Sequence, residues 1–128
     1  MSYHFSRQLD TTFTDAEARV DRQLEEEGFG ILTEIDVQAT LKKKLDVDFT
    51  PYKILGACNP SFAYQALQVE PHIGTMLPCN VILRELSKGK VEVSAVDPLA
   101  SMQAIDNPEL GSIARQIRDK LKKVINAL

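Results

Sequence analysis

Hydrophobic and polar residues alternate along residues 3–9 of the chain. Phe5 and Leu9 fall on one side of this alternation, and Ser6 and Gln8 fall on the other. A period of two is typical of a β-strand with one buried face. The opening stretch is therefore predicted to be a strand.

The next stretch changes to a helical period. Apolar residues recur every fourth position at Ala16, Val20 and Leu24. Thr14 followed by Glu17 has the spacing of a capping box, and a glycine at position 28 is a typical helix stop. We expect one helix between these two signals.

The remaining pattern predicts mostly strands with short helical insertions. Asp36 and Asn59 are expected to cap two of these helices, and Pro51 indicates an edge position or an irregular start for the strand that contains it. The segment 98–105 has no clear period. The predicted elements are a strand at 29–35, a helix at 36–45, a strand at 49–57, a helix from residue 60, a loop at 70–78, strands at 79–86 and 91–95 joined by a turn, and a final helix from residue 108.

This order of elements predicts an α+β fold with a single domain over residues 1–128. We expect an antiparallel sheet of about five strands with helices packed on one face. The chain of 128 residues has no repeat and no linker, and 44% of it is hydrophobic, so it is long enough and apolar enough to form one core.

Charge and composition exclude several classes of protein. A net charge of −3 argues against nucleic-acid binding, and the lysine run at 42–44 is expected to be a solvated helix face. No apolar stretch approaches the roughly 20 residues of a membrane span, and the first residues lack the pattern of a secretory leader. We therefore expect a cytoplasmic protein with no membrane partner. Its two cysteines are expected to be free thiols.

Two segments are not explained by core and surface patterning. Residues 55–60 and 74–80 each contain a cysteine followed by an asparagine, with a proline beside the pair. If the strands that carry them are antiparallel neighbours, the two motifs meet at one edge of the sheet. We predict that Cys58, Asn59, Cys79, Asn80 and His72, which comes from the loop between the motifs, form a ligand-binding site. The two asparagines also have plainer roles, as a helix cap and as a strand-end side chain that bonds to loop backbone groups.

Three motifs carry a resemblance to a known family. They are Lys53-Ile-Leu-Gly-Ala-Cys-Asn-Pro60, Leu77-Pro-Cys-Asn-Val81 and Ala95-Val-Asp-Pro98. With these motifs the chain resembles the domain of unknown function 302 family over nearly its whole length. The resemblance implies the topology of a TATA-box-binding-protein repeat, strand-helix-four strands-helix, without implying DNA binding. The family implies no established activity.

Three functions remain open at this point. The first is a small-ligand or thiol-linked binding module around the two Cys-Asn motifs. The second is a cysteine-dependent or redox enzyme in which Cys58 acts with a base such as His72. The third is a structural or interaction protein with inert cysteines. We expect no metal site, because the chain lacks a Cys-x-x-Cys pair, and the sequence identifies no cofactor. A homodimer is the expected assembly, since the sheet leaves edges and a face to cover.

Overall fold

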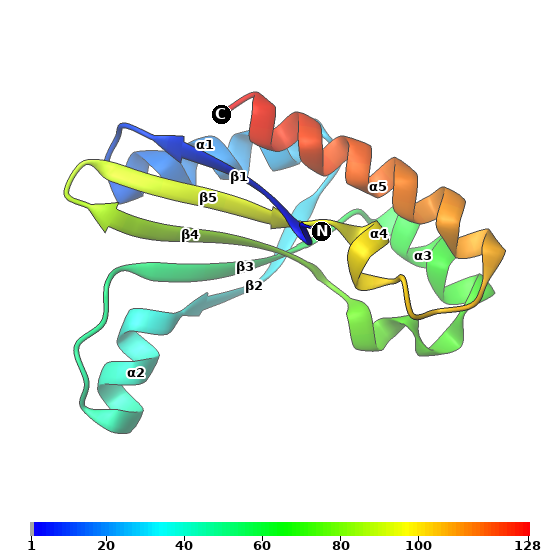
Figure 1. The fold of residues 1–128 in the computed structure, drawn as a ribbon, viewed down its shortest axis with the longest axis horizontal. Helices are drawn as coiled ribbons and strands as arrows, with labels where there is room; N and C mark the ends of the chain where they lie inside the picture. The colour runs from blue at the N-terminus through cyan, green and yellow to red at the C-terminus, as the bar shows by residue number, and fades with distance from the viewer. Residues whose placement is uncertain (1) are drawn as a thin grey trace.

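The computed structural model describes residues 2–128 and is built around a five-stranded antiparallel sheet (Figure 1). Across the sheet the strand order is β1-β5-β4-β3-β2, and every neighbouring pair is antiparallel. The strands are β1 (His4–Leu9), β2 (Gly30–Asp36), β3 (Tyr52–Cys58), β4 (Cys79–Ser87) and β5 (Lys90–Val96). The helices are α1 (Phe13–Glu26), α2 (Val37–Leu45), α3 (Pro60–Val69), the 3₁₀ helix η1 (Pro71–Met76), α4 (Pro98–Ser101) and α5 (Pro108–Asn126). The predicted α+β class with a five-stranded antiparallel sheet is confirmed.

The core lies between the sheet and the two long helices α1 and α5. The apolar stripe of α1 is buried, as its four-residue period predicts, and α5 buries a longer stripe. Alternate residues of β4 and β5, such as Val81, Leu83 and Val93, face these helices and are fully buried. The likeness to a TATA-box-binding-protein repeat stays a prediction, because three further short helices and η1 interrupt the simple order of elements.

The start of α1 differs from the prediction. Thr12, and not Thr14, is the N-cap, and its hydroxyl oxygen accepts a hydrogen bond from the backbone N–H of Asp15 at 3.1 Å. Both threonines are followed three residues later by an acidic residue, so the two sites compete. Because Thr12 is the cap, the helix starts about half a turn earlier than predicted.

The short helices lie at the two ends of the sheet. Helices α3, η1 and α4 gather at one end, whereas α2 projects from the far ends of β2 and β3, away from α1 and α5 (Figure 1). Asp36 caps α2 as expected, through a 2.9 Å hydrogen bond that its carboxylate accepts from Ala39. Strand β3 begins directly after Pro51 and lies between β2 and β4, so this proline marks an irregular start and not an edge strand.

Among residues 2–128, no helix is long and apolar enough to cross a membrane.

Candidate functional site

The two cysteines meet at the end of the sheet that carries α3 and α4. The register of β3 and β4 pairs Ala57 with Cys79, so Cys58 follows one residue beyond that pair. Both cysteines line a small cavity of about 20 Å³, which we call the thiol void. Its other walls come from α3, from the segment before β4 and from α5.

The thiol void is small and apolar. Its volume is that of about one water molecule, and carbon and sulfur atoms dominate its lining, so it is the kind of cavity that stays dry. Cys79 is only 5% exposed. Burial, and secondly the nearby Cys58 thiol, raises the pKa of Cys79 to about 11. Cys79 is therefore a neutral thiol at physiological pH.

Asn59 connects two helices in place of capping one. It occupies the N-cap position of α3, but its side chain makes no capping hydrogen bond. Its amide Nδ2 instead donates to the carbonyl of Glu27 at the end of α1, at 3.2 Å. The same amide nitrogen lies where it would be 3.1 Å from a side-chain carbon at Gly28. Asn59 thus fastens the start of α3 to the turn that follows α1.

Of the five residues predicted to form one site, Cys58, Asn59 and Cys79 line the thiol void, whereas Asn80 and His72 do not. Successive side chains of a strand point to opposite faces, and Asn80 therefore lies on the open face of the sheet while Cys79 faces the helices. His72 lies in η1, where its side chain is 92% exposed and its Nδ1 is 3.6 Å from a carboxylate oxygen of Glu70. It does not line the thiol void.

Asn80 belongs to a broad hollow of about 480 Å³ on the open face of the sheet, which we call the open-face hollow. Part of its polar lining is already hydrogen-bonded. The guanidinium Nε of Arg84 donates to Glu92 at 2.8 Å. The hydroxyl groups of Ser6 and Ser94 share a 2.7 Å hydrogen bond. The polar side chains of Tyr3, Tyr52 and Asn80 also line the hollow.

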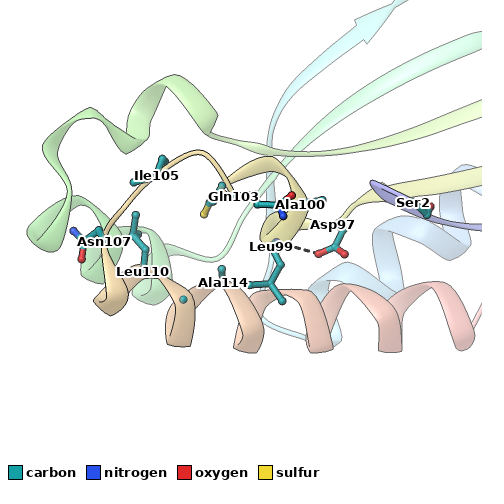
Figure 2. A pocket seen from close by; sticks show the side chains of 11 residues that line it. Ser2, Asp97, Leu99, Ala100, Gln103, Ile105, Asn107, Leu110 and Ala114 are labelled. Atoms are coloured by element: carbon teal, nitrogen blue, oxygen red, sulfur yellow. Dashed lines mark hydrogen bonds between the residues drawn. The ribbon is translucent and has the colours of Figure 1, made fainter.

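A second hollow of about 450 Å³, also open to solvent, lies between α5 and the segment that contains α4, and we call it the α4–α5 pocket. Figure 2 shows Leu110 and Ala114 rising from α5 toward Ile105 and Ala100 on the opposite wall. Asp97 is the one charged residue among the described residues of the lining. The pocket therefore combines apolar walls with one carboxylate and the polar side chains of Ser2, Gln103 and Asn107.

Asp97 stands at the junction of β5 and α4. One of its carboxylate oxygens accepts a 3.0 Å hydrogen bond from the backbone N–H of Leu99, drawn as a dashed line in Figure 2. Its own N–H donates to the carbonyl of Tyr3 at 2.8 Å. These bonds fix the carboxylate at one end of the pocket.

Sequence reasoning did not identify this pocket. In the sequence, Asp97 and Pro98 stand out only as part of the Ala95-Val-Asp-Pro98 motif, and residues 98–105 have no clear period. One signal was present, which is a glycine at position 111 inside the amphipathic final helix. Gly111 lines the α4–α5 pocket.

Comparison with known proteins identifies the family. A family model described as "Domain of unknown function DUF302" matches residues 5–128. A crystal structure of an uncharacterised conserved DUF302 protein from Bacillus stearothermophilus is similar to this chain, with a TM-score of 0.91 and 27% sequence identity over 99% of this chain and 98% of that one. None of the curated proteins compared with the chain matches it. The chain belongs to the DUF302 family.

Proposed function

We propose that this protein binds a small, mainly apolar molecule with a positively charged or hydrogen-bond-donating head group in the α4–α5 pocket. Pockets for small ligands measure roughly 300–1,000 Å³ and combine apolar walls with few polar groups. The α4–α5 pocket, at about 450 Å³, fits this description. The proposal keeps the expected class, a small-ligand binding module, and moves the site away from the cysteines.

Gly111 is the observation that carries the proposal. It lies within the 19-residue helix α5, where glycine costs about 1 kcal/mol relative to alanine. A Cβ atom built on Gly111 would have only one neighbour within 4 Å, the Nη1 atom of the exposed Arg115 side chain at 3.4 Å. Packing therefore does not require glycine here. The absence of a side chain at position 111 instead leaves the space of the pocket unfilled.

Asp97 supplies the polar recognition. A carboxylate at one end of an apolar pocket favours a ligand with an ammonium or N–H group at the matching end, and it disfavours an anionic ligand. The aliphatic walls on α5 and on the α4 segment would then cover the body of the molecule.

The cysteine alternatives receive less support from the geometry. A nucleophilic Cys58 needs a base, and the residues that line the thiol void include neither a histidine nor a carboxylate. The void is also too small for a ligand by itself. Inert packing of both cysteines is compatible with the proposed pocket.

The test is an NMR titration of the ¹³C-methyl- and ¹⁵N-labelled protein with n-hexylamine. We expect shifts in the methyl groups of Leu99, Ile105 and Leu110, all in the pocket wall. Hexanoate, of equal chain length and opposite charge, should bind at least fivefold more weakly. Asp97→Asn should remove that preference, since asparagine still caps α4.

The matched pair Gly111→Leu and Ser112→Leu separates the pocket from the helix that carries it. Leucine at 111 fills the cavity and should abolish the shifts, whereas Ser112 is exposed on another face of α5 and its replacement should leave them unchanged. No shift with millimolar hexylamine, or shifts that persist in Gly111→Leu, would overturn the proposal.

A further inference from the structure

We infer that the site in the α4–α5 pocket continues past Met102 into the thiol void, so that its ligand carries a linear apolar tail that reaches Cys58 and Cys79. This inference rests on the proposed function and narrows the class of ligand to an amphiphile with a cationic head and an unbranched chain.

Met102 is the wall between the two cavities. It lines both the α4–α5 pocket and the thiol void, and it is 7% exposed. Helix α5 runs beneath both: Leu110 and Ala114 face the pocket, whereas Ile113 and Ile117 face the void. The two cavities thus lie along one helix and share Met102 as a lining residue, so a passage between them would run past this side chain.

Methionine is suited to open such a passage. Its unbranched side chain has three rotatable bonds and adapts to irregular apolar space, whereas a β-branched residue is stiff at its first torsion. Met102 also follows the four-residue helix α4, where Ile105 donates a backbone hydrogen bond to the Met102 carbonyl at 3.0 Å. A change of rotamer at Met102 leaves that backbone bond in place.

The thiol void restricts the shape and polarity of what can enter. With a volume of about 20 Å³ it takes the end of an alkyl chain beside the displaced Met102 side chain, but not a ring system. The side-chain amide of Asn59 is already bonded to the Glu27 carbonyl. A tail in the void therefore contacts carbon and sulfur, while the head group remains at Asp97.

A series of n-alkylamines tests the extension. Butylamine and hexylamine should shift only signals of the α4–α5 pocket, whereas octylamine and decylamine should also shift Ala57, Cys58 and Ile117. The affinity should rise about fourfold per added methylene from butylamine to octylamine, because each methylene is removed from water, and it should level off at decylamine, whose chain exceeds the space in the void. Shifts confined to the pocket, with an affinity that levels off after hexylamine, would overturn the extension and leave the proposed function intact. The absence of binding by every amine would overturn the proposed function itself.

Variants at Met102 test its role as the movable wall. Met102→Ala should strengthen octylamine binding several-fold more than hexylamine binding, and Met102→Ile, with its stiff branch, should weaken octylamine alone. Met76→Ala, at an exposed methionine, is the matched control and should change neither. Should Met102→Ala fail to fold, Met102→Ile and the wild-type series still decide the question. An unchanged ratio of octylamine to hexylamine affinity in Met102→Ile would contradict the inference.

Discussion

Gly56 lies on β3 at a place where two other segments leave no room for a side chain. A Cβ atom built there would be 2.7 Å from the Cγ atom of Pro78 and would overlap the Oγ1 atom of Thr33 on β2. We expect Gly56→Ala to lower the free energy of unfolding by about 1–3 kcal/mol, measured by urea denaturation.

Gly30→Ala is the matched control, because nothing lies within 4 Å of a Cβ atom at that position on β2. Its stability should equal or slightly exceed that of wild type. Removing the Thr33 hydroxyl in Gly56→Ala/Thr33→Ala should recover part of the loss. Wild-type stability in the Gly56→Ala variant would show that β2 and Pro78 move aside without penalty.

Cys79 gives a second prediction at the level of the residue. Burial, followed by the neighbouring Cys58 thiol, raises its pKa to about 11, and alkylation requires the thiolate. In Cys58→Ser, iodoacetamide should label Cys79 slowly at pH 8, at a rate that climbs tenfold per pH unit up to its pKa. The pKa of Cys79 should lie somewhat lower in this variant than in wild type, because the Cys58 thiol that helps to raise it is absent. Titration near the ordinary thiol value of about 8.5 would contradict the burial, provided circular dichroism shows a folded protein.

At the scale of elements, α5 contributes the most buried surface. Seven of its residues are buried, and Leu121 is fully enclosed. Leu121→Ala should lower the free energy of unfolding by about 2–5 kcal/mol, because it removes buried methyl groups and leaves a cavity. Lys123→Ala, two residues further along the exposed side of α5, should change it by less than about 0.5 kcal/mol. Thermal and urea unfolding of the two variants measure the difference, and equal stabilities would show that α5 packs loosely.

The long elements could be predicted from the sequence, because their apolar period reports which face is buried. The stripe of α5 and the alternation of β5 are examples. The short elements could not: α4 has four residues and η1 has six, too few to show a helical period. The meeting of Cys58 with Cys79 followed from antiparallel pairing, whereas the α4–α5 pocket depends on how the segment after Asp97 returns across α5. That return is a tertiary feature with no local pattern.

At the scale of the whole molecule, six of the eleven large apolar side chains that are exposed among residues 2–128 belong to β2, α2 and the segment after α2. Strand β2 is an edge of the sheet, and all seven of its residues are exposed. The exposed apolar residues of β2, α2 and the segment after α2 are Ile31, Leu32, Ile35, Leu45, Val47 and Phe49. Exposed apolar residues on a free sheet edge are typical of a surface that meets another chain.

We expect a second copy of the chain to cover this surface in a symmetric dimer. In this dimer β2 of one copy pairs with β2 of the other, so that each edge strand gains backbone hydrogen-bond partners. The register shift between Ile31 and Thr33 interrupts the strand, so residues 33–36 are the part of β2 suited to regular pairing.

Light scattering after size-exclusion chromatography should give about twice the chain mass at tens of micromolar protein. The variant Leu32→Lys/Ile35→Lys should elute as a monomer, because it would put four like charges into the interface of the dimer. Tyr64→Lys replaces a side chain that is 67% exposed on α3 and should leave the dimer unchanged. A wild-type monomer at that concentration would contradict the assembly, and a dimer that survives the double lysine variant would place the interface elsewhere.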